Sequence, residues 1–158
     1  GYFYESFQKE RFEQATQLSF NPIQDNETYS TYGVIRGLHF QKEPFAQAKL
    51  VRALRGTILD VAVDLRKDSR TYGAVVTFEL SQKNKEQLFV PKGCAHGYAV
   101  LSSDAVVFYK TDAYYHPEFE GGILYNDPEL NIDWRITEKD QILSEKDTLW
   151  RDLKNSFL

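Results

Sequence analysis

The side chain at position 39 is the first candidate for acid-base chemistry, because a histidine can take up and release a proton near neutral pH. His39 follows Arg36 and Gly37 in a segment that is predicted to be a strand. Residues three apart in a regular strand point to opposite faces, so Arg36 and His39 share a side only if Gly37 hosts a bulge. Taken alone, His39 is better interpreted as a hydrogen-bonded structural histidine.

The other two histidines carry weaker signals. His96 lies in segment 91–97, which is predicted to be a turn between strands, and His116 precedes Pro117 in a loop that we expect to face solvent. A metal site of the two-histidine-plus-glutamate type needs closely spaced ligands, and the residues on either side of His39 are apolar. The chain is therefore predicted to bind no metal ion.

Cys94 is the single cysteine of the sequence, so it cannot form an internal disulfide or build a zinc site from several cysteines. His96 follows it too closely in sequence to serve as its base, and we expect a small packed thiol. A reducing cytoplasm is the expected compartment.

Several other side chains could take part in chemistry, but each has an ordinary explanation. Tyr109 lies near the end of a predicted strand, where tyrosines are usually packing residues. Lys49 opens an apolar strand, a position at which lysine is usually a surface residue. Asp147, without further information, is expected to be exposed to solvent. Asp60 and Asp64 share the less apolar face of one strand. That pattern is consistent with a polar barrel interior, although the strand by itself favours acids that face water.

The elements that must position these groups are mostly strands. Short runs with alternating polarity, separated by turn residues, predict strands at 34–41, 49–55, 57–66, 74–80, 87–91, 97–101 and 105–110. A short amphipathic helix is expected within residues 5–18, and turns and short helices within 137–153. Many short strands at this spacing indicate a β-sandwich or barrel.

The composition sets limits on the class of protein. The chain has 158 residues, of which 42% are hydrophobic and 27% charged, as expected for one globular domain. Its net charge of -4 argues against a protein that binds nucleic acid or an anionic membrane. No apolar run is long enough for a membrane span.

The segment VIRGLHFQ at 34–41 resembles the characteristic motif of the dTDP-4-dehydrorhamnose 3,5-epimerase family. Further resemblances follow in the same order at 3–7, 24–26, 49–52, 60–66, 91–97, 109–110, 114–115, 126–127 and 143–147. The resemblance spans essentially the whole chain. It implies a mostly β fold, a cupin or jelly-roll barrel with a few short helices, in a homodimer that needs neither metal nor organic cofactor.

The family resemblance also implies an activity, the inversion of C3 and C5 in a dTDP-linked 4-keto-6-deoxy sugar. It gives His39 the role of base, Asp147 that of the carboxylate that orients the imidazole, and Tyr109 that of the acid on the opposite face. Lys49 would lie near the oxyanion that develops at C4. We add the inference that Asp60 holds Lys49 through a salt bridge.

The substrate-binding residues are likewise carried over from the family pattern. Arg36 and Lys146 match positions near the diphosphate, where guanidinium and ammonium groups are suited to bind phosphate oxygens. The remaining matches to ligand-contacting positions are Glu5, Gln24, Asn26, His96, Tyr115 and Glu120. Glu5, Gln24 and Asn26 would contact the nucleotide, and the family pattern also allows them to do so from the other subunit of the dimer.

The family pattern continues before Gly1, with an acidic residue, an arginine and a strand, and the sequence contains no Met. We therefore expect that an N-terminal strand is missing from the single domain 1–158. Two alternatives stay open. One is a related epimerase that inverts C3 or C5 alone, and the other is a cupin that binds sugar nucleotides without catalysis.

Overall fold

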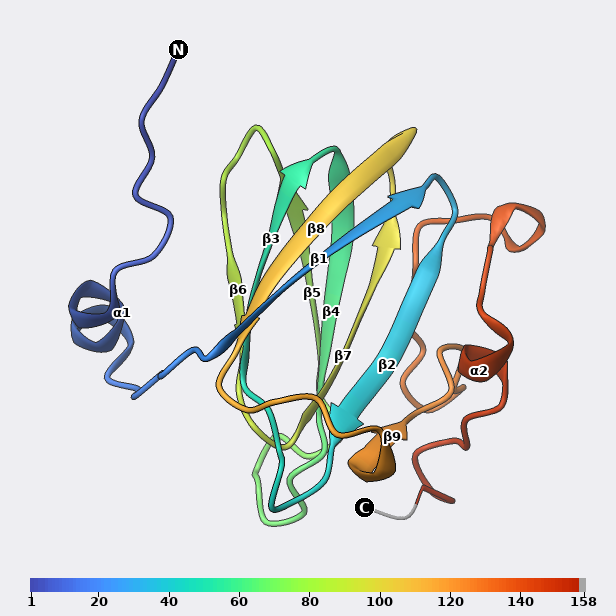
Figure 1. Ribbon diagram of the computed structural model, residues 1–158. Coiled ribbons are helices and arrows are strands. Elements are labelled where there is room, and N and C mark those ends of the chain that lie inside the picture. The colour runs from blue at the N-terminus through green and yellow to red at the C-terminus, as the bar shows by residue number, and fades with distance from the viewer. Residues whose placement is uncertain (157–158) are drawn as a thin grey trace.

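Two antiparallel β-sheets face each other in the computed structural model, which describes residues 1–156 (Figure 1). The four-stranded sheet has the order β1 (Gln24–Thr31), β8 (Asp104–Thr111), β3 (Lys49–Arg55) and β6 (Leu88–Val90). The five-stranded sheet has the order β5 (Val75–Ser81), β4 (Thr57–Asp64), β7 (Cys94–Val100), β2 (Ile35–Gln41) and β9 (Glu120–Gly122). This arrangement confirms the predicted mostly β barrel.

The helices are short and lie outside the sheets. They are α1 (Lys9–Thr16), the 3-10 turns η1 (Pro117–Phe119) and η2 (Glu138–Asp140), and α2 (Glu145–Thr148). α1 and α2 lie on opposite sides of the barrel, with α2 beside β2 and β9 (Figure 1). α1 confirms the helix predicted within residues 5–18. No helix in the described part of the chain is long and apolar enough to cross a membrane.

The hydrophobic core lies on both faces of the five-stranded sheet. Leu59, Val61 and Val63 of β4 pack under the C-terminal segment, whose Trp134 belongs to the same buried cluster. Ile58 of the same strand packs in a second cluster between the two sheets. The central strand is therefore covered on both sides.

This double cover corrects the expectation that the acids of β4 face water. Asp60 and Asp64 are both buried, because the opposite sheet or neighbouring loops cover the face on which they lie. Asp64 accepts hydrogen bonds from Arg66, and one oxygen of Asp60 lies within hydrogen-bond distance of His96. The other interpretation of this strand, in which the two acids indicate a polar barrel interior, is the correct one.

The segment around His96 differs from its prediction as a turn. β7 begins at Cys94, so Cys94 and His96 lie in a central strand rather than in a loop. Gly93, with a φ of +78°, makes the turn just before it. Cys94 is the buried thiol that was predicted, and burial is the main cause that raises its pKa. His116 is also not simply solvent-exposed, because its ring stacks on Phe45 with 3.7 Å between centroids.

A β-bulge at Gly37 interrupts the pairing of β2 with β7, between Arg36 and His39. Gly37 has a φ of +121°, and a Cβ atom there would lie 2.5 Å from the Cα of Gly97. Only glycine is compatible with both conditions. The bulge that the sequence suggested is therefore confirmed, just before His39.

Candidate active site

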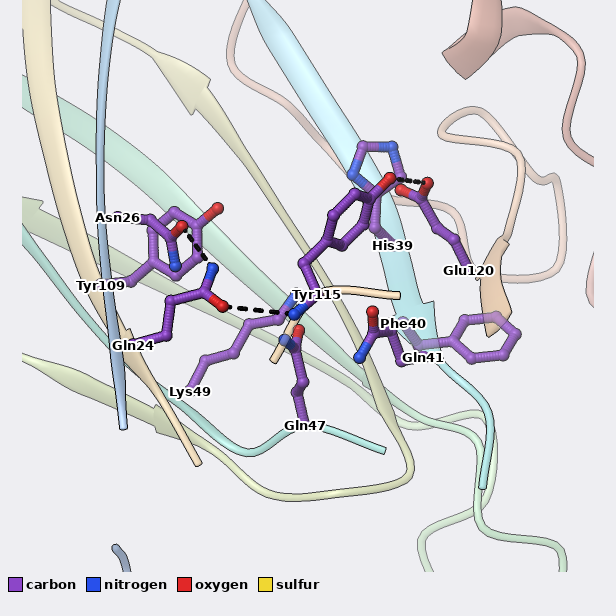
Figure 2. Close-up of a pocket in the computed structure, with 10 residues that line it drawn as sticks. All are labelled: Gln24, Asn26, His39, Phe40, Gln41, Gln47, Lys49, Tyr109, Tyr115 and Glu120. Atoms are coloured by element: carbon purple, nitrogen blue, oxygen red, sulfur yellow. Dashed lines mark hydrogen bonds between the residues drawn. The ribbon is translucent and has the colours of Figure 1, made fainter. Parts of the chain in front are cut away.

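A cavity of about 250 Å³ lies between the two sheets and opens at one end of the barrel. Figure 2 shows the side chains that line it, which are Gln24, Asn26, His39, Phe40, Gln41, Gln47, Lys49, Tyr109, Tyr115 and Glu120. Most of the residues singled out from the sequence are in this set. They come from both sheets and from the loop that precedes β9.

His39 enters the cavity from β2 and is bound from behind by Asp147 of α2. The His39 Nε2 and Asp147 Oδ1 atoms are 2.5 Å apart. Asp147 is only 2% exposed, and its backbone N–H donates to the hydroxyl of Ser144, the N-cap of α2. Burial by itself would raise the pKa of Asp147, but the hydrogen bond and charge of His39 outweigh it and lower the pKa. The carboxylate is therefore ionised where it meets the imidazole.

Tyr109 enters the same cavity from β8, in the other sheet, so its ring and that of His39 lie on different walls (Figure 2). Burial is the main cause that raises the pKa of the Tyr109 phenol, with a smaller contribution from Tyr98, while Arg36 acts in the opposite direction. A phenol in this environment keeps its proton at neutral pH and can donate it.

Lys49 places an ammonium group between these two walls. It is 9% exposed, and burial lowers its pKa from 10.5 to about 8, although Asp60 and Glu120 act in the opposite direction. Most Lys49 side chains are therefore charged at pH 7. A buried cation in a small cavity interacts strongly with any negative charge that develops there.

The prediction that Lys49 and Asp60 form a salt bridge is wrong. Asp60 Oδ1 instead lies 2.7 Å from His96 Nε2, and Oδ2 is buried with no hydrogen-bond partner in residues 1–156. Asp60 and His96 lie on the paired strands β4 and β7, whereas Lys49 lies on β3 of the opposite sheet. Asp60 influences Lys49 across space, without direct contact.

Glu120 connects two other side chains at the mouth of the cavity. It accepts hydrogen bonds from the Tyr115 hydroxyl, at 2.7 Å, and from the Lys146 ammonium (Figure 2 shows the Tyr115 bond). The bond to Glu120 is the main cause that raises the pKa of Tyr115 to about 12. Gln24 accepts from the Tyr115 backbone N–H at 3.2 Å and donates to Asn26 at 2.9 Å.

Some predicted substrate-binding residues do not line this cavity. Glu5 lies in the N-terminal segment, where it is exposed and pairs with Arg11 at 2.8 Å. Arg36 is exposed and donates to the Ser30 hydroxyl. His96 lies behind the cavity with Asp60, and Lys146 reaches the cavity only through Glu120.

Three residues that line the cavity were not predicted, and one of them had a readable signal. Gln41 follows His39 by two positions in the same strand, so strand periodicity places the two on one side. Gln47 precedes Lys49 by two positions, just before β3 begins. Gln47 and Phe40 had no such signal. In the described part of the chain, no three His, Cys, Asp or Glu side chains are grouped so that they could hold a metal ion.

Comparison with known proteins gives matches among the sugar-nucleotide epimerases. A family model described as dTDP-4-dehydrorhamnose 3,5-epimerase matches residues 1–155. The protein of that name from Methanothermobacter thermautotrophicus is 48% identical over 157 residues, which cover 99% of this chain and 84% of the relative.

Solved structures agree with this result. The crystal structure of dTDP-4-dehydrorhamnose 3,5-epimerase from Elizabethkingia anophelis has a TM-score of 0.95 and 52% identity, covering 98% of this chain and 85% of that one. The epimerase from Legionella pneumophila, solved in complex with dTDP-4-keto-L-rhamnose, has a TM-score of 0.93 and 47% identity, covering 98% and 81%. With matches along nearly its full length, the chain belongs to the dTDP-4-dehydrorhamnose 3,5-epimerase family of cupin-fold isomerases.

Proposed function

We propose that this protein converts dTDP-4-dehydro-6-deoxy-D-glucose to dTDP-4-dehydro-L-rhamnose by inverting C3 and C5, a step of dTDP-rhamnose biosynthesis. The observation that carries the proposal is the placement of His39 and Tyr109 on different walls of one cavity. Inversion at carbon needs a base on one face and an acid on the other. The names of the relatives support the same reaction and substrate.

The first half of each inversion is removal of a proton. The hydrogens on C3 and C5 are α to the C4 ketone, so their removal gives an enolate without a redox step or a hydride carrier. His39 takes the proton, and the Asp147 carboxylate orients its ring and stabilises the imidazolium. The Lys49 ammonium stabilises the negative charge that develops on the C4 oxygen.

The second half is delivery of a proton to the opposite face. Tyr109 donates its phenolic proton to the enolate carbon, which its protonated state at neutral pH allows. Between the two inversions His39 releases its proton to solvent and Tyr109 takes one up, so the same pair of groups serves C3 and then C5 after the ring has moved within the cavity. The proton transfers therefore use two side chains that line this cavity, His39 and Tyr109, with Asp147 behind His39.

The charged part of the substrate extends toward the cavity mouth. Arg36 and Lys146 bind the diphosphate, and Lys146 exchanges Glu120 for a phosphate oxygen when substrate enters. Gln24, Asn26 and Tyr115 contact the nucleotide at the edge of the cavity. Glu120 holds Tyr115 in place through their hydrogen bond. His96 lies behind the cavity, where it binds Asp60, and it therefore influences the cavity only indirectly.

Glu5 does not reach the cavity of its own chain, because it lies with Arg11 in the N-terminal segment. We assign it to nucleotide binding in a homodimer, where this segment would reach the other subunit. Sedimentation of the protein at micromolar concentration tests the dimer, and a monomer would contradict it. A single functional domain at 1–158 and a cytoplasmic location stay predictions.

Hydrogen exchange tests the proposed reaction directly. The protein is incubated with dTDP-4-dehydro-6-deoxy-D-glucose in D₂O, and ¹H NMR follows C3 and C5. Deuterium at both carbons, together with the L-rhamno product, is the expected result. Label at one carbon alone would show a single-carbon epimerase. Stabilisation by dTDP in a thermal shift assay, without any exchange, would show a protein that binds without catalysis.

A further inference from the structure

Trp150 lies two residues beyond the end of α2, beside the side chains of His39 and Lys146. Its ring lies edge-on to the His39 ring, with 6.2 Å between centroids and 67° between planes. The Lys146 ammonium lies 5.7 Å from the centre of the same ring. Trp150 does not line the substrate cavity, so any effect on the reaction passes through these neighbours.

The Trp150 ring rests on the backbone of β9. A Cβ atom built on Gly122 would come within 2.4 Å of ring carbon atoms of Trp150, so the indole covers the place where a side chain would be. Gly122 is the residue paired with His39 between β9 and β2. The indole therefore packs on Gly122, the strand residue that pairs with His39.

α2 needs such a contact because it is only four residues long. A helix of that length has no stability of its own and depends on tertiary packing. On the far side of Trp150 the chain is held by its backbone, where Leu124 donates to the Arg151 carbonyl at 2.9 Å and Leu153 donates to Asp127 at 2.6 Å. Trp150 is therefore the side chain that lies between these two hydrogen bonds and α2.

We infer that Trp150 is a positioning residue for the proposed epimerisation, which seats α2 on Gly122 so that Asp147 meets His39 in the productive direction. The inference rests on the proposed function. It predicts that losing the indole reduces turnover while leaving substrate binding largely intact, because the residues that line the cavity are unchanged and Lys146 keeps its hydrogen bond to Glu120.

The test compares Trp150→Ala and Trp150→Phe with the unmodified protein, using the exchange assay well below each melting temperature. Trp150→Ala should lower kcat by roughly ten- to a hundredfold, the penalty of misplacing a reacting group by about 1 Å, with KM changed by less than about threefold. Trp150→Phe keeps a flat ring on Gly122 and should recover most of kcat.

Two control variants separate positioning from loss of stability. Leu149→Ala changes a 73% exposed side chain on the same turn and should leave kcat within about twofold. Leu153→Ala removes a buried side chain further along the segment and should lower the melting temperature with little effect on kcat. An equal loss of kcat in Leu153→Ala would contradict a specific role for Trp150.

A double-mutant cycle with Gly122 tests the contact itself. Gly122→Ala should lower kcat in the unmodified protein, because its methyl group displaces the indole, but should have little further effect in Trp150→Ala. Additive penalties, or full kcat in Trp150→Ala, would overturn the inference. If the unmodified protein itself shows no exchange, the proposed function fails instead.

Discussion

Asp147 places its Oδ1 atom 2.5 Å from Nε2 of His39, although 108 residues separate the two in the chain. The aspartate reaches this position from α2, while the histidine projects from β2 next to the Gly37 bulge. The pair therefore exists only when the C-terminal segment has docked on the five-stranded sheet. The effect of this pair on catalysis can be measured by substituting Asp147, which does not itself line the cavity.

Asp147→Asn should lower kcat by roughly 10²- to 10⁴-fold, because an amide cannot stabilise the imidazolium and can select the wrong tautomer of His39. The rate of deuterium incorporation at C3 and C5 measures this loss. Glu145→Gln, an exposed change on the same short helix, is the matched control and should keep full activity. Full activity in Asp147→Asn would remove Asp147 from the mechanism.

Tyr109→Phe should separate exchange from inversion. His39 can still remove a proton and return a deuteron to the same face, so label should enter the substrate while the L-rhamno product forms much more slowly. NMR of both species over time gives the two rates. Tyr114→Phe, at a 61% exposed tyrosine nearby, should affect neither. Inversion at the normal rate in Tyr109→Phe would assign the acid to another group.

Lys49→Met should make the protein more stable and less active. The pKa of Lys49 is about 8 in the folded state and 10.5 in the unfolded state, so the native protein binds fewer protons between these values. Stability therefore rises with pH through this window, and the cost of burying the charge is fully present at pH 7. The shift corresponds to roughly 3 kcal/mol, which is the upper limit of the expected gain.

Urea denaturation of both proteins at pH 7 and near pH 10.5 measures this effect. The difference in unfolding free energy should shrink at the higher pH, where the lysine is neutral in the folded state and only about half charged in the unfolded state. In the exchange assay, Lys49→Met should lose roughly 10²- to 10³-fold in kcat, as on removal of an oxyanion donor. A less stable Lys49→Met protein at pH 7 would contradict the prediction.

Asp64→Asn should weaken the fold and spare the reaction. Asp64 accepts hydrogen bonds from Arg66, Ser69 and Thr71, and the Arg66 bond is the main cause that lowers its pKa. A lowered pKa stabilises the folded state above the unfolded-state value of about 4, and this contribution is lost as the pH falls.

Removing the Asp64 carboxylate should cost roughly 1–3 kcal/mol near neutral pH and flatten the loss of stability in acid. Thermal unfolding between pH 3 and pH 7 measures both effects, and kcat below the melting temperature should not change, because Asp64 does not line the cavity. Asp68→Asn, at an exposed acid in the same loop, is the control. Equal losses in the two variants would argue against the Asp64 network.

The barrel could be predicted from the sequence because strand formation follows local periodicity. β3 has the bounds that were predicted, and the Gly37 bulge follows from a glycine between Arg36 and His39. β1 and β9 were not predicted, since β1 begins with a run of polar residues and β9 has only three residues. Neither strand has the apolar alternation that marks the others.

The sequence by itself determined most of the strands, the family and most residues of the cavity, because these depend on residue type, spacing and order along the chain. Only the tertiary structure decided that Asp60 is buried and binds His96 rather than Lys49. The contact of Asp147 with His39 was implied by the family resemblance and not by the local pattern, and the structure shows how α2 makes it. The physical reason is that alternation defines the two faces of a strand but not what covers each face. Which distant side chains meet depends on how the sheets and the C-terminal segment pack, and local sequence does not encode this.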